Sequence, residues 1–163
     1  MNKDVEKNIN ILHFILQGIH LCIHLSVVEK IFPLTFIEKI PYSPNYLVGV
    51  MNFSGKSIPV IDLALRLSLE RKHFYSLDTP IILCDHQSHQ TGVIVDEIIG
   101  LAQVKQDQLQ MHEDFQGDKS SILGVIRSND DLILMLNMDA VLKINLRSEK
   151  NSNKLKLTPL IGS

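Results

Sequence analysis

The chain has 163 residues, enough for one domain with a sizeable core, and its 16 basic and 18 acidic residues give a formal net charge of −2. The basic residues are scattered except toward the C-terminus, which argues against a nucleic-acid-binding surface. The N-terminus is polar and no apolar run reaches the roughly 18 residues that span a bilayer, so we expect a cytoplasmic protein without direct membrane insertion.

Two strands are predicted near the N-terminus, on either side of Gly18. Residues 9–17 and 19–28 are rich in apolar side chains, and in the second stretch apolar and polar residues alternate. A period of two places the apolar residues on one face of a strand. The pattern therefore predicts a half-buried β-hairpin.

Residues 49–67, GVMNFSGKSIPVIDLALRL, contain letters that suggest a phosphate-binding loop. Such a loop ends in Gly-Lys-Ser at the start of a helix, and here Gly55, Lys56 and Ser57 have that order. Pro59, however, would fall inside the required helix, where proline is strongly unfavourable. The stretch is therefore interpreted as strands rather than as a nucleotide site.

We predict a second hairpin in this region, made of residues 46–53 and 56–61. Gly55 and Lys56 are expected to form its turn. Asp62 follows the second strand and is expected to cap a short helix with its carboxylate.

The later part of the chain repeats this order. Residues 124–142, GVIRSNDDLILMLNMDAVL, align without a gap with the stretch that begins 75 residues earlier, and Asn137 takes the place of the capping Asp62. Another predicted hairpin, PIILCD followed by TGVIVDEIIGLAQV, precedes it. Two copies indicate an internal duplication rather than a solenoid.

Short strands at close spacing, with few helices, favour a mainly β fold of two small antiparallel barrels that share a core. We expect the folded domain to cover residues 9–146, with a first half of about 9–77 and a second of about 78–146. Residues 1–8 and 147–163 are polar and lack strand alternation, and are expected to be flexible.

No metal site, cofactor site or disulfide is predicted. His20 and His24 share a strand face but would lie about 13 Å apart. A second candidate set of ligands lies at a predicted polar turn and consists of Cys84, Asp85, His86 and His89. A structural zinc site normally has a second pair of ligands, and none is evident here. Cys22 and Cys84 are expected to be unbonded core residues.

Catalytic chemistry has weak support. Ser54 is the candidate nucleophile, but its surroundings lack the Gly-x-Ser-x-Gly elbow, and a turn serine usually bonds to local backbone. Asp96 and Glu97 would point to opposite faces of a strand and make a poor acid–base pair.

Three motifs resemble the CheW family of chemotaxis coupling proteins. They are YLVGVMNFSGKSIPVIDLALRL, TGVIVDEIIGLAQV and ILGVIRSNDDLILMLNMDAVL. The first is similar to the family pattern Gly-Val-x-Asn-x-Arg-Gly-x-x-x-Pro-Val-x-Asp-Leu. The resemblance covers residues 9–146 and implies two five-stranded SH3-like barrels around a shared core.

The resemblance also implies function. Family members are non-enzymatic cytoplasmic adaptors, recruited to receptor arrays at the membrane. They bind the like-folded regulatory domain of a CheA-type histidine kinase and, between their barrels, the cytoplasmic tip of a methyl-accepting chemoreceptor. By their motif positions, Glu29, Gly49 and Asn52 are implied to lie near the receptor contact, and Val95 and Asp96 beside the groove.

Ser54 departs from the family pattern, which has arginine at this position. Arginine forms charge-assisted hydrogen bonds that the short, neutral serine cannot form. We expect Ser54 to lie at a partner surface with weakened coupling. Two alternatives stay open: an adaptor of a specialised array that controls pili and twitching, and a hydrolase-like enzyme that uses Ser54.

Overall fold

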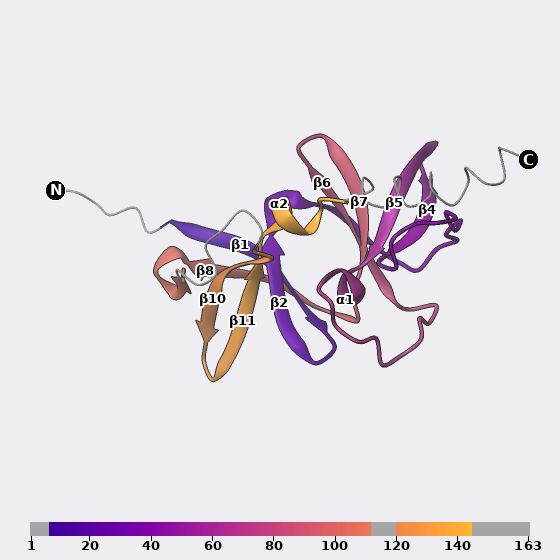
Figure 1. Cartoon of the computed structure of the whole chain (residues 1–163). Coiled ribbons are helices and arrows are strands. Elements are labelled where there is room, and N and C mark those ends of the chain that lie inside the picture. Colours follow the sequence, from indigo (N-terminus) through magenta and orange to yellow (C-terminus); the bar gives the residue numbers. More distant parts are fainter. Residues whose placement is uncertain (1–6, 112–119, 145–163) are drawn as a thin grey trace, which may run out of the picture.

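The computed structural model describes residues 7–111 and 120–144, which fold mainly as β-strands in two sheets (Figure 1). The first sheet contains, in spatial order, β3 (Val28–Pro33), β6 (Pro80–His86), β7 (His89–Ile94), β5 (Lys56–Asp62) and β4 (Leu47–Phe53). The second contains β8 (Glu97–Lys105), β1 (Asn8–Leu16), β2 (Ile19–His24), β11 (Asp131–Leu136), β10 (Ile122–Ser128) and β9 (Leu109–Gln110). The predicted mainly β class is confirmed, with the two-residue β9 as a sixth strand in the second sheet.

Helices are short and lie between or after strands. They are η1 (Leu25–Val27), α1 (Leu63–Arg66), η2 (Gln106–Gln108) and α2 (Met138–Val141). In the part of the chain that is described, no helix is both long enough and apolar enough to span a bilayer.

The duplication is visible in the topology. The hairpin β4–β5 with α1 and the hairpin β10–β11 with α2 follow the same order and show the same register shift next to their first glycine. In each repeat the last strand also pairs in parallel with a strand of another hairpin, β5 with β7 and β11 with β2. The two sheets therefore contain equivalent strands in equivalent order.

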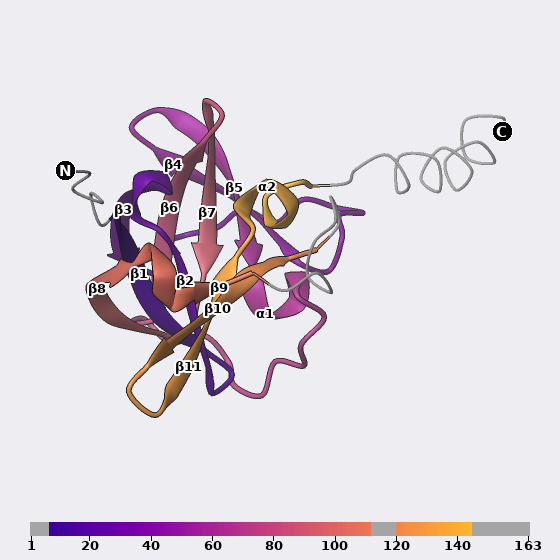
Figure 2. The same cartoon turned by 90° about the vertical axis from the view of Figure 1, so that its left-hand side faces the viewer.

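Each sheet nevertheless takes strands from both halves of the chain. The N-terminal hairpin β1–β2 pairs with β8 and β11, whereas the later hairpin β6–β7 pairs with β3 and β5. Figure 2 shows the early strands β1 and β2 beside the late strands β8, β10 and β11. A division of the chain near residue 77 thus separates the two repeats but does not separate the two sheets.

The largest apolar cluster lies between the sheets. Leu12, Phe14 and Leu21 from the second sheet pack with Ile82 and Val93 from the first, and all five are at most 2 % exposed. Full burial of one such side chain contributes about 1.5–3 kcal/mol. This shared core joins the two sheets into one unit.

Turn chemistry corrects one detail of the second hairpin. Ser54 (φ +50°) and Gly55 (φ +79°) form the turn, and Lys56 is already the first residue of β5. Two consecutive positive φ values are typical of a tight hairpin turn that matches the strand twist. The predicted turn of Gly55 and Lys56 was therefore wrong by one residue.

The two predicted helix caps differ. Asp62 Oδ1 accepts a hydrogen bond from Leu65 N at 3.3 Å, which confirms it as the cap of α1. Asn137 precedes α2 but makes no side-chain cap bond, because its Nδ2 donates to the carbonyl of Ser120 at 3.1 Å. The side-chain cap predicted for Asn137 was wrong.

The N-terminal boundary is also revised. Asn8 is the first residue of β1, and Gln106 N donates to the carbonyl of Lys7 at 3.0 Å, so these two residues are not loose. The remainder of the expected flexible ends, residues 1–6 and 147–163, lies outside the described residues.

Candidate functional site

The turn between β4 and β5 is exposed and is built by local hydrogen bonds. Asn52 Oδ1 accepts a hydrogen bond from Gly55 N at 3.1 Å, which ties the strand to the turn. Ser54 is exposed, and no hydrogen bond to its hydroxyl is observed among residues 7–111 and 120–144. The turn therefore presents Asn52 and Ser54 to solvent.

Gly49 has a structural reason to be glycine. A Cβ atom on Gly49 would lie 2.0 Å from the carbonyl oxygen of Glu38, which is far inside van der Waals contact. The loop before β4 approaches this closely because Glu38 and Val50 exchange two backbone hydrogen bonds of 2.8 Å. Gly124 has the same role in the second repeat, where a Cβ would lie 2.7 Å from the carbonyl of Gln110.

Glu29 lies on the outer strand β3 and is exposed. Its Oε2 accepts a hydrogen bond from Gln90 Nε2 at 2.7 Å, so it is held above the start of β7. The β4–β5 turn lies at the same end of the first sheet, because β5 and β7 run parallel and both begin there. The structure therefore brings Glu29, Asn52 and Ser54 to one end of this sheet.

Val95 and Asp96 lie at the opposite end, where the chain crosses from β7 to β8. Val95 is fully buried in the shared core. Asp96 Oδ2 accepts two hydrogen bonds from Gln17, one from the backbone N at 2.6 Å and one from Nε2 at 3.0 Å. Asp96 thereby links the β1–β2 turn of the second sheet to the end of the first.

A partly buried polar network continues from Asp96, and the sequence did not predict it. Arg71 donates to Asp96 Oδ1 at 3.1 Å and to both oxygens of the fully buried Asp62, at 2.5 and 2.7 Å. The Tyr75 hydroxyl also donates to Asp62. The network links the two sheets at their seam, and no motif in the sequence marked Arg71 or Tyr75 as partners of Asp62.

Burial and pairing shift two pKa values in this network. Burial acts to lower the pKa of Arg71, but the hydrogen bonds and charge of Asp62 outweigh it and raise that pKa above its ordinary value. Burial, and after it the hydrogen bond to Asp62, raises the pKa of the Tyr75 phenol. Both groups therefore stay protonated in the physiological range and serve as permanent donors to Asp62.

Comparison with known proteins decides the family. The sequence model of the CheW-like domain family matches residues 10–145 of this chain. The chain belongs to the CheW-like family. The chemotaxis protein CheW of Thermotoga maritima is 26% identical over 144 residues, which cover 86% of this chain and 91% of that protein. The Helicobacter pylori protein of the same name is 26% identical over 120 residues, covering 73% and 72%.

The CheW-like fold is also found in a solved structure. The scaffolding protein TtCheW from Thermoanaerobacter tengcongensis matches with a TM-score of 0.77 at 24% identity, over 85% of this chain and 95% of that one. This likeness confirms the predicted fold of two SH3-like units. As a family member, the chain is a chemotaxis adaptor that couples receptors to a CheA-type kinase.

The histidines and cysteines of this CheW-like chain are dispersed, and no group of three or more ligands that could hold a metal occurs among the described residues. Cys22 and Cys84 are buried free thiols, and burial raises the pKa of each to about 12. His20 bonds to His13 instead of His24, with 2.8 Å between His13 Nε2 and His20 Nδ1.

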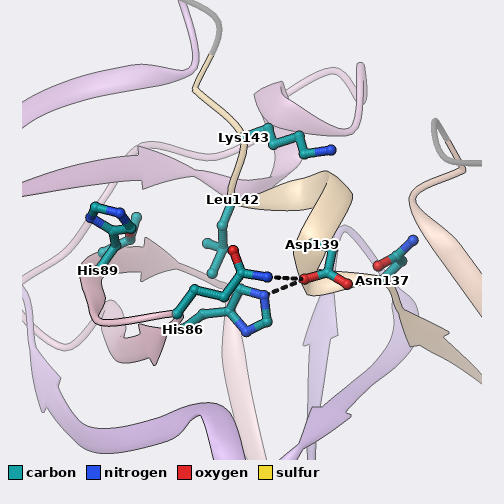
Figure 3. Close-up of a pocket in the computed structure, with 8 residues that line it drawn as sticks. His86, His89, Asn137, Asp139, Leu142 and Lys143 are labelled. Carbon is teal, nitrogen blue, oxygen red and sulfur yellow. Dashed lines mark hydrogen bonds and ion pairs between the residues drawn. The ribbon is translucent and has the colours of Figure 1, made fainter.

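One polar cleft of about 540 Å³ adjoins the end of the first sheet that carries Glu29 and Ser54 (Figure 3). His86 Nε2 is hydrogen bonded to Asp139 of α2, and Gln87 Nε2 donates to the same carboxylate at 3.3 Å. The bonds join the β6–β7 turn to α2, and so connect the first sheet to the end of the second. His86 and His89, considered above as metal ligands, thus line a cleft instead.

Proposed function

We propose that this CheW-like protein is a non-enzymatic cytoplasmic adaptor, recruited to membrane receptor arrays, with separate surfaces for a chemoreceptor tip and for the regulatory domain of a CheA-type kinase. The observation that carries the proposal is the family match over residues 10–145. Exposed apolar side chains at the edges of the shared core support it, because adaptor surfaces of this kind need apolar contact area.

The receptor surface is assigned to the outer strands β3 and β8. Ile31 pairs with Ile82 and Leu101 pairs with Leu12, and both partners belong to the shared core. Ile31 is 37% exposed and Leu101 is 68% exposed, because their strands lie at the sheet edges. Each edge thus extends the shared core to solvent, where the apolar face of an amphipathic helix can pack.

Polar residues on either side of this apolar surface would fix the position of the helix. Glu29, Asn52 and Ser54 lie at one end of the first sheet and Asp96 at the other, separated by the length of β7, roughly 20 Å. A helix of about 13 residues covers that distance. Val95 is buried, so we assign it the role of positioning Asp96 from inside the core.

The kinase surface is assigned to the second sheet. β11 leaves Leu132 55% exposed next to the turn at Asn129, away from the β6–β7 turn. A regulatory domain of similar fold can pack there end to end, with apolar contact around Leu132.

Co-sedimentation with a receptor fragment and the kinase regulatory domain from the same cell tests the assignment. Leu101→Lys is expected to abolish binding of the receptor fragment and to spare the kinase domain, and Leu132→Lys to do the reverse. Phe36→Lys is the matched control, because Phe36 is 79% exposed on a loop outside both surfaces. Wild-type protein that binds neither partner would refute the adaptor proposal, and equal losses in all three variants would refute the assigned surfaces.

A further inference from the structure

The cleft beside α2 continues into a second cavity and forms one groove. The first cavity, of about 540 Å³, and the second, of about 400 Å³, share His89, Thr91 and Leu142 as lining residues. In the first cavity one wall carries His89 at the start of β7, and the other is formed by α2 and Leu142 (Figure 3). Ile144 continues the second wall in the second cavity. The groove therefore runs between an element of the first sheet and the end of the second.

Its far end lies where two parallel strands diverge. β5 and β7 pair only from Val60 and Gly92 onward, so residues 56–59 and 88–91 are not paired with each other. The same residues line the second cavity. An extended peptide segment can enter the space between two strands that diverge.

The groove is electropositive in a protein that is negative overall. Lys143 lines the first cavity and Lys56 the second, and Asp139 is the only carboxylate among the described residues that line them. Asp139 is already hydrogen bonded to His86 and Gln87. The two lysines outnumber this one carboxylate among the described lining residues, so the groove carries a net positive charge.

The sequence that follows Ile144 is itself basic. It contains Arg147, Lys150, Lys154 and Lys156 against Glu149, and it begins at a residue that lines the groove. The net charge of this sequence therefore has the same sign as the two lysines that line the groove. The complementary occupant is a segment of negative charge.

We propose that this groove binds an acidic, extended segment of another protein. Carboxylates of the segment pair with Lys56 and Lys143, and alternate apolar side chains of an extended chain rest on Leu142 and Pro59. The groove adjoins Glu29 and Ser54 of the proposed receptor surface, but no residue assigned to that surface lines it, so the inference goes beyond receptor coupling.

The test is fluorescence anisotropy with a short labelled peptide in which Glu and Leu alternate. We expect binding of this peptide that weakens with added salt, and no binding of a peptide in which Lys and Leu alternate. The double variant Lys56→Glu with Lys143→Glu should bind at least about tenfold more weakly. The matched control is Lys39→Glu with Lys72→Glu, which makes the same change in net charge at two exposed lysines outside the groove.

Three outcomes would overturn the proposal. One is an equal loss of binding in both double variants, which would indicate general charge attraction. Another is tighter binding after truncation at Ile144, which would show that the chain's own C-terminal sequence competes for the groove; we expect equal or slightly weaker binding. The third is loss of receptor co-sedimentation in the Lys56→Glu, Lys143→Glu protein, which would make the groove part of the receptor surface.

Discussion

Arg71 and Asp62 form a bidentate ion pair at the seam between the two sheets, with distances of 2.5 Å from Nε and 2.7 Å from Nη2. Asp62 has no solvent exposure, and its carboxylate also accepts from Leu65 N and from Tyr75. A buried charge is tolerated only when it is paired and hydrogen bonded. One residue thus caps α1, anchors the loop after it and, through Arg71, reaches Asp96.

We predict that Arg71→Met destabilises the protein by about 3 kcal/mol, because it leaves the buried carboxylate of Asp62 without its counter-charge. The measurement is the free energy of unfolding from urea titration. The double variant Arg71→Met with Asp62→Asn should recover part of the loss, since the buried charge is then gone. A loss below about 1 kcal/mol in the single variant would mean that Tyr75 and the backbone satisfy Asp62 alone.

Gly49→Ala is predicted to cost about 3 kcal/mol, because the new Cβ meets the Glu38 carbonyl and must push the loop away from β4. Gly18→Ala is the matched control. Gly18 has φ +78°, and a Cβ atom added to it would meet nothing within 4 Å, so the substitution should cost only about 1 kcal/mol of backbone strain. Faster amide exchange at Val50 in Gly49→Ala alone would locate the damage, and equal costs in the two variants would contradict the steric explanation.

The sequence predicted what depends on local pattern and missed what depends on distant contacts. Period-two alternation and the glycine-led hairpins identified the strands, and the gapless repeat identified the duplication. The strand patterns do not distinguish pairing within a half from pairing across halves, so the exchange of the β1–β2 and β6–β7 hairpins was not predictable. Asp62 was recognised as a helix cap from its position after a strand. Its ion-pair partner, Arg71, lies in a loop, where no hydrophobic periodicity indicates which residues will be in contact.

The candidate site was predicted only in part, for the same reason. Motif position pointed to Glu29, Asn52 and Ser54, and hairpin geometry places all three at one end of the first sheet. The cleft next to them depends on α2 meeting the β6–β7 turn through His86 and Asp139. These residues are far apart in sequence and belong to different hairpins, so neither spacing nor composition indicated their contact.

Acidification is predicted to destabilise the second sheet through His13. Burial, and then the neighbouring His20, lowers the pKa of His13 in the folded protein, while Asp131 acts in the opposite direction. The unfolded chain therefore binds more protons than the folded one as the pH falls below about 6.5, and the free energy of unfolding decreases. The 2.8 Å hydrogen bond between the two rings also favours the unprotonated form, because one of the two nitrogens must be unprotonated to accept it.

The check is urea unfolding at about pH 7 and about pH 5 for the wild type and for His13→Gln. Other groups also titrate over this range, so the informative quantity is the difference between the two proteins. The wild type should lose more stability than the variant on acidification. Equal losses would show that His13 does not contribute to the pH dependence.

Ser54→Arg is predicted to strengthen assembly with the receptor fragment and the kinase domain. The substitution restores the arginine of the family motif at an exposed turn, where its guanidinium can form charge-assisted hydrogen bonds to a partner. Ser68→Arg is a matched control, because Ser68 is also an exposed serine with a positive φ, +59° against +50° for Ser54, and lies outside the strands assigned to the two partner surfaces. Both arginines carry the same backbone strain and the same added charge. Tighter co-sedimentation with Ser54→Arg alone would place Ser54 at a partner surface, whereas equal affinity in wild type and both variants would remove it from that surface.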